Sequence, residues 1–148
     1  MPEAFVVTPG TRPAPLNVVG EQITVLASGS QTGGYEIFRQ VGPEGSGPPP
    51  HYHPWDESFY VVRGNVAFGV GDKDVIAEPG TLVHLPADTM HWFRYGKSGG
   101  EMISMASREA ASHFFTEVHR AISPEAPDVA KFAQIANQHR LTVAAPPR

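Results

Sequence analysis

The sequence contains no cysteine, no block of basic residues and no long apolar run, and each absence excludes a class of protein. Without thiols the chain cannot form disulfides, thiolate zinc sites or iron–sulfur clusters, and it has no Cys nucleophile. A net charge of −4 argues against nucleic-acid binding and against attraction to anionic membranes. The N-terminus lacks the pattern of a signal peptide. We therefore expect a soluble, cytoplasmic protein with neither nucleic acid nor membrane as a partner.

The composition predicts one β-rich domain. A chain of 148 residues is long enough for one hydrophobic core. Glycine and proline number 15 each, which is more than average, but 41% of the residues are apolar and only 18% are charged. Such a chain can bury its apolar surface, so the many glycines and prolines indicate tight turns between short strands rather than disorder.

Strand patterns occupy the part of the chain from residue 17 to residue 107. Short stretches rich in β-branched and aromatic residues alternate with turn residues, and residues 63–65 and 71–72 resemble hairpin turns. The spacing of about 8–12 residues is typical of a β-sandwich or a small antiparallel barrel. Residues 1–16 contain four prolines, so we expect an extended N-terminal arm there.

The hydrophobic period changes after residue 107. Apolar residues such as Phe114 and Val118, and later Phe132 and Ile135, recur at helical spacing. We expect residues 108–148 to form a short helical extension that packs on the β body, because about 40 residues cannot build a core of their own. Ser123 followed by a proline suggests the N-cap of the second helix.

The residues that carry chemistry are two histidines, a glutamate and a third, more distant histidine. Residues two apart in a strand point to the same face, so His51 and His53 project together and Glu57 keeps the same parity. If His91 begins a neighbouring strand, it supplies a third imidazole. Imidazole and carboxylate ligands in this arrangement suit a divalent transition metal.

The spacing around these residues resembles the first motif of the cupin family. Gly45, His51, His53, Glu57 and Gly64 follow the family pattern G-x5-H-x-H-x3-E-x6-G without a departure. Composition alone makes the whole pattern rare, whereas a lone His-x-His pair is a weak signal.

A second cupin motif follows with two departures. It is present as Gly80, Pro86, Asp88, His91 and Tyr95 in the pattern G-x5-P-x-D-x2-H-x3-Y. Cupins usually have Gly at the position of Asp88 and Asn at that of Tyr95. Aspartate tolerates left-handed conformations better than most residues, so Asp88 is expected to fit a tight turn.

The resemblance implies an all-β fold, an antiparallel jelly-roll barrel over residues 17–107. It further implies a metal held by His51, His53, Glu57 and His91 near one mouth of the barrel, and a homodimer. The ion would be Fe, Mn, Ni, Cu or Zn, which the ligand types do not distinguish. The short spacing between the motifs and the helical end resemble small quercetinase-like cupins.

From this site we expect a metal-dependent dioxygenase that acts on a small enolisable or phenolic, flavonol-like compound through a metal-bound substrate oxygen. Glu57 would be both a metal ligand and the catalytic general base, with dioxygen as the second substrate. Two alternatives stay open, because one fold hosts many functions. The protein could be a non-redox metal-dependent isomerase, lyase or cyclase, or a cupin that binds a small ligand without turnover.

Several further side chains are candidates for the interior. Phe59, Val61, Phe68 and Phe93 are expected to fill the barrel and in part to line a pocket. Trp55 shares the parity of the ligands and could close the pocket or cap the barrel. His84 could point into the cavity or away from it.

Overall fold

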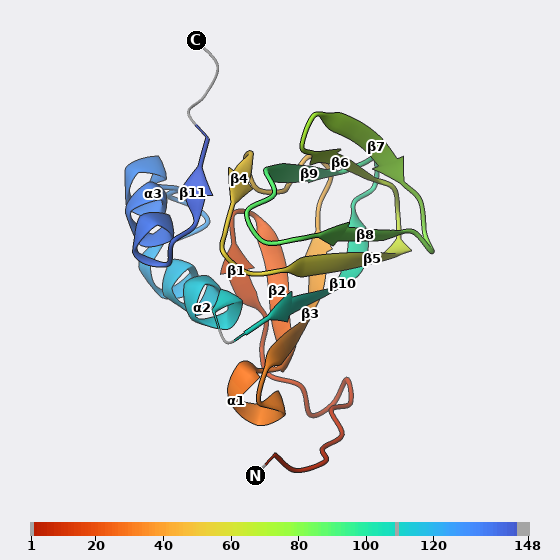
Figure 1. Ribbon diagram of the computed structural model, residues 1–148, viewed down its shortest axis with the longest axis vertical. Helices are drawn as coiled ribbons and strands as arrows, with labels where there is room; N and C mark the ends of the chain where they lie inside the picture. The colour runs from red at the N-terminus through yellow and green to blue at the C-terminus, as the bar shows by residue number, and fades with distance from the viewer. Residues whose placement is uncertain (1, 109, 145–148) are drawn as a thin grey trace.

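Two antiparallel sheets form the body of the molecule, with the two longer helices together at one side and a short helix at the end near the N-terminus (Figure 1). The structure is a computed structural model that describes residues 2–108 and 110–144. The first sheet has the order β1 (Leu16–Val18), β2 (Glu21–Ala27), β3 (Tyr35–Gly42), β10 (Gly100–Ser107), β5 (Glu57–Arg63), β8 (Leu82–Leu85). The second has the order β11 (Thr142–Val143), β4 (His51–Tyr52), β9 (His91–Tyr95), β6 (Val66–Val70), β7 (Lys73–Ala77). The helices are α1 (Gly29–Thr32), α2 (Ala111–Ala121) and α3 (Val129–Gln138). The expected all-β jelly-roll barrel with a short helical part is confirmed.

The interior of the barrel is filled by alternate residues of facing strands. Phe59 and Val61 of β5 and Phe68 and Phe93 of the opposite sheet are buried, as the sequence predicts. The three phenylalanine rings contact one another with centroids 5.3–5.5 Å apart. This aromatic cluster fills part of the barrel interior, and Phe59 and Phe93 also border the cavity described below.

Strand β3 turns polar side chains inward. Its buried face carries Glu36, Phe38 and Gln40, whereas Ile37 and Val41 of the opposite face are partly exposed. The Glu36 carboxylate accepts hydrogen bonds from the backbone N–H groups of Gly29 and Ser112, both at 2.9 Å. A buried carboxylate satisfied in this way ties the start of α2 to the barrel.

The two predicted hairpins differ in outcome. Residues 71–72 join β6 to β7 in one sheet, and this hairpin is confirmed. Residues 63–65 join β5 to β6, which belong to different sheets, so the hairpin predicted there is wrong. Gly64 has a φ of +78°, which lets the chain pass from one sheet to the other, and a Cβ at this position would lie 2.3 Å from the carbonyl oxygen of Gly99.

We expect Gly64→Ala to destabilise the fold by about 2–5 kcal/mol, because the left-handed backbone and the steric overlap each carry a cost. The matched control is Gly34→Ala, since Gly34 has an ordinary φ and no atom within 4 Å of an added Cβ. Urea unfolding of the two variants measures the difference. Equal midpoints for both would show that the turn tolerates a side chain.

The C-terminal part of the chain packs on the barrel and also adds a strand to its second sheet. Helix α2 packs against β1, and α3 packs against α2. Beyond α3 the chain returns as β11, which pairs with β4 so that Val143 lies opposite His51. The sequence did not predict β11, because two residues are too few for a strand pattern. No helix in residues 2–108 and 110–144 is both long enough and apolar enough to span a bilayer.

The predicted start of the second helix is wrong. The N-cap of α3 is Asp128, whose side chain accepts a hydrogen bond from the Lys131 N–H at 2.9 Å. A helix beginning after Ser123 would place Pro127 in its interior, where proline lacks the N–H donor and clashes with the preceding turn. Helix α3 therefore begins only after Pro127.

Candidate metal centre

Three buried histidines converge at one end of the barrel. His51 of β4 and His91 of β9 are direct partners in the sheet, and His53 follows β4 by one residue. The candidate ligand atoms of the three residues all lie within 4.8 Å of one another. The parity of His51 and His53 and the neighbouring position of His91 therefore bring the three imidazoles together.

Backbone carbonyls fix the orientation of all three rings. The Nδ1–H of His51 donates to Pro49 O at 2.8 Å, that of His53 to Trp55 O at 3.0 Å, and that of His91 to Thr89 O at 2.8 Å. A proton on Nδ1 leaves the Nε2 lone pair available as a metal ligand. Burial and the neighbouring His91 lower the pKa of His51 to about 3, which keeps it in the neutral, ligating form.

Glu57, at the start of β5, points its carboxylate at two of these rings. Its Oε1 atom lies 3.3 Å from His53 Nε2 and 3.4 Å from His91 Nε2. Burial by itself would raise the pKa of Glu57, but the two histidines outweigh it and hold the pKa at about 2. Glu57 is thus an ionised carboxylate at neutral pH.

The donor set fits a divalent cation. With Nδ1 protonated, the Nε2 atoms and the Glu57 carboxylate all present lone pairs to one another, and a bound cation would satisfy all of them. Within residues 2–108 and 110–144, the buried Nε2 atom of His91 has no hydrogen-bond partner. A buried polar atom of this kind is rare unless an ion or ligand completes it. Three imidazoles together with one carboxylate suit a divalent transition metal.

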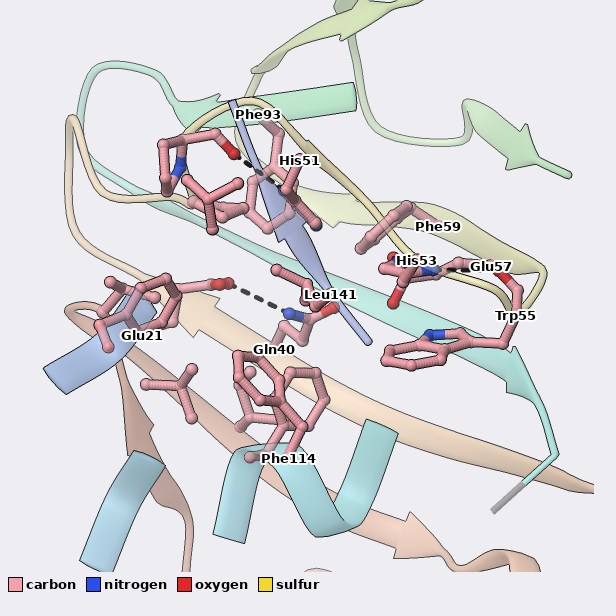
Figure 2. Close-up of a pocket in the computed structure, with 18 residues that line it drawn as sticks. Glu21, Gln40, His51, His53, Trp55, Glu57, Phe59, Phe93, Phe114 and Leu141 are labelled. Carbon is pink, nitrogen blue, oxygen red and sulfur yellow. Dashed lines mark hydrogen bonds and ion pairs between the residues drawn. The ribbon is translucent and has the colours of Figure 1, made fainter. Parts of the chain in front are cut away.

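A cavity lies beside these residues (Figure 2), and its empty space, which includes open solvent at its mouth, is about 530 Å³. Barrel residues such as Phe59 and Phe93 form part of its wall. The C-terminal part of the chain forms much of the rest, with side chains from α2, α3, β11 and the segment between them: Phe114, Phe115, Phe132, Leu141 and Val143. The helical extension is therefore a wall of the cavity as well as a cover for the barrel.

The two residues whose direction the sequence left open point to opposite places. Trp55 is buried, lines the cavity and stacks on His53 with the ring planes 6° apart and the centroids 4.2 Å apart. His84 is exposed, and its ring hydrogen-bonds the Ser58 hydroxyl at 2.8 Å on the outside of the barrel. Trp55 thus supports a candidate ligand, and His84 lies outside the cavity.

Sequence reasoning missed two polar residues of the cavity, Glu21 of β2 and Gln40 of β3. The Tyr95 hydroxyl donates to Glu21 Oε2 at 2.8 Å, and Gln40 Nε2 donates to the same oxygen at 3.3 Å. Burial and the charge of Glu57 raise the pKa of Glu21 to about 8 against the hydrogen bonds from Tyr95 and Gln40. Their shared parity with buried Ile23 and Phe38 is the signal that could have identified them.

This raised pKa predicts a pH-dependent loss of stability. Between pH 4.5 and about 8 the folded protein binds a proton at Glu21 that the unfolded chain has lost, so stability falls as pH rises through this window. We expect Glu21→Gln, which keeps an oxygen for Tyr95, to remove roughly 3–5 kcal/mol of this pH-dependent change in the free energy of unfolding. Urea unfolding of chelator-treated protein at pH 5, 7 and 9 measures it. Parallel pH curves for variant and wild type would contradict the assignment.

The two departures in the second motif have structural explanations. Asp88 adopts a φ of +65°, as expected for a residue in the place of glycine, and its N–H donates to His53 O at 2.8 Å. Tyr95 fills the barrel and reaches Glu21 with its hydroxyl. Asp88 therefore positions the chain beside a candidate ligand, and Tyr95 connects the barrel interior to the cavity.

Comparisons with known proteins find a cupin domain in the middle of the chain. The cupin domain family matches residues 38–104. Quercetin 2,3-dioxygenase of Bacillus subtilis is 26% identical over 91 residues, which cover 60% of this chain but only 27% of that protein. The chain thus spans about a quarter of the length of this curated relative.

Solved structures agree on the fold. An RmlC-like cupin from Shewanella frigidimarina superposes with a TM-score of 0.66 at 17% identity, over 76% of this chain and 96% of the other. The polyketide cyclase RemF from Streptomyces resistomycificus gives 0.61 at 17% identity, over 71% and 80%. At these identities the likeness concerns the fold alone. The jelly-roll barrel, the two motifs and the family match over residues 38–104 together support a small cupin that resembles quercetinase-like proteins.

Proposed function

We propose that the protein is a metal-dependent dioxygenase that acts on a small enolisable or phenolic compound. One observation carries the proposal: three histidines with fixed Nδ1 protons converge with one ionised glutamate, and two of them, His51 and His53, line an apolar, aromatic-lined cavity together with Glu57. The partial similarity to quercetin 2,3-dioxygenase supports the choice of substrate class.

The proposed ligands are His51, His53, Glu57 and His91. When bound there, a divalent ion supplies Lewis acidity, which makes a hydroxyl group of the substrate easier to deprotonate. Glu57 Oε1 accepts this proton as general base, since Glu57 is ionised at neutral pH and buried beside the histidine ligands. Phe59, Phe93 and the side chains of the extension hold the apolar part of the substrate and exclude water.

The reaction balances without a further reductant. The deprotonated substrate provides the electrons, dioxygen is the oxidant, and both oxygen atoms end in the product. The chain's own contribution is to hold the substrate, remove one proton and keep bulk water from the site.

Oxygen uptake tests the proposal. Protein reconstituted separately with Fe, Mn, Ni, Cu or Zn is mixed with quercetin or 3-hydroxyflavone in an oxygen electrode, and the substrate is followed by absorbance. We expect at least one redox-capable ion to support equimolar consumption of oxygen and substrate. Product formation without oxygen uptake would contradict the proposal and favour isomerase, lyase or cyclase chemistry. Binding of the flavonol without consumption under all five ions would favour a ligand-binding cupin.

A further inference from the structure

Two buried polar atoms of the cavity are left without a partner in the described part of the chain. They are the acceptor Gln40 Oε1 and the donor Trp55 Nε1. Both side chains are almost completely buried, and both line the cavity that His51, His53 and Glu57 also line. A folded protein rarely leaves such atoms unpaired, because burial removes their hydrogen bonds to water.

A hydrogen bond to Glu21 orients the side-chain amide of Gln40. Its Nε2 group donates to Glu21, which in turn accepts from the Tyr95 hydroxyl, so the amide nitrogen is committed to Glu21. In Figure 2 the Glu21 carboxylate lies on the side of Gln40 away from Trp55 and His53. The amide oxygen of Gln40 is therefore the atom that remains for a ligand.

We propose that Gln40 Oε1 and Trp55 Nε1 recognise a neutral hydroxyl-bearing part of the substrate, separate from the oxygen that reaches the three histidines. A hydroxyl group both donates and accepts, which matches the acceptor on Gln40 and the donor on Trp55. The inference rests on the proposed function, because it assumes that the cavity holds the substrate. It narrows the substrate to a compound with two oxygen functions.

The surroundings favour a neutral group over a charged one. No lysine or arginine is among the described residues that line the cavity, so a carboxylate or phosphate would be buried without a counter-charge. The pKa of Glu21, raised to about 8, leaves its side chain uncharged at neutral pH, and the ionised Glu57 is assigned to the metal, so an ammonium group beside Gln40 also lacks a counter-charge. A hydroxyl group needs neither.

Matched phenols measure this recognition by calorimetry on zinc-loaded protein. The probes are the 2-, 3- and 4-hydroxybenzyl alcohols and the corresponding cresols, which differ only in one hydroxyl group. We expect wild-type protein to bind at least one alcohol about tenfold or more tighter than its cresol, since a buried hydrogen bond gives discrimination of this order. In Gln40→Met the preference should fall below twofold while cresol binding stays within twofold of wild type.

The control variant is Gln22→Met, which changes an exposed glutamine of β2 and should keep the preference. Urea unfolding is the second readout and checks that Gln40→Met stays folded under the titration conditions, because the substitution also removes the hydrogen bond from Gln40 to Glu21. Equal binding of each alcohol and its cresol by wild type, or a preference that survives in Gln40→Met, overturns the inference.

Repeating the titrations without zinc separates this inference from the proposed function. The hydroxyl preference involves no histidine and should persist in the zinc-free protein. Failure to take up any metal would contradict the proposed function while the preference still stands. Loss of the preference with metal uptake intact would overturn the hydroxyl site alone.

Discussion

Replacing His53 with alanine should weaken metal binding by at least about 100-fold while the β fold persists. His53 is buried, its Nε2 faces Glu57 Oε1 at 3.3 Å, and its ring stacks on Trp55. Changes in residues that merely support a ligand already cost 10–100-fold in affinity, so removal of a ligand costs more. Metal per chain after dialysis against a buffered ion measures the loss, and circular dichroism reports the fold.

His84→Ala is the control for this experiment. It removes a histidine of β8 that lies on the outer surface of the barrel and is hydrogen-bonded to Ser58. We expect its metal content to equal that of wild type. Equal metal in wild type and His53→Ala would remove His53 from the site.

Glu57→Gln should lower turnover by about 100-fold or more with a much smaller loss of metal. General bases typically contribute 10²–10⁴-fold to a rate, and an amide cannot accept the proton at neutral pH. The same amide keeps an oxygen beside His53 and His91, and the three imidazoles remain in place. Steady-state kinetics on metal-matched samples, with metal content measured on the same samples, separates the two effects.

Asp56→Asn is the matched control, because it makes the same chemical change one residue earlier. Asp56 is exposed and accepts a hydrogen bond from the Ala87 N–H at 2.8 Å, outside the cavity. Its turnover should stay within about threefold of wild type. If Glu57→Gln turned over at the wild-type rate, Glu57 would not be the base.

The convergence of the three histidines could be anticipated because these residues obey short-range rules. The period of a strand aligns His51 with His53, and a neighbouring strand brings in His91. Asp88 could likewise be placed in a left-handed turn from its chemistry. Such rules depend on a few adjacent residues, which the sequence shows directly.

The remaining cavity depends on contacts that no local pattern encodes. Gln40 lies on the buried face of β3, although the more apolar alternation of that strand favours the other face. Its burial becomes clear only when Glu21 and Tyr95 are seen beside it. The pairing of β11 with β4 likewise joins segments about 90 residues apart and is set by how α2 and α3 pack.

The most direct measurement is elemental analysis of protein expressed without added metal, followed by a crystal structure with an anomalous-difference map. We predict close to one transition-metal ion per chain and a single peak between the Nε2 atoms of His51, His53 and His91 and the Glu57 carboxylate. Protein that takes up no ion even after incubation with all five candidate metals, and a map without a peak among these four side chains, would contradict the account.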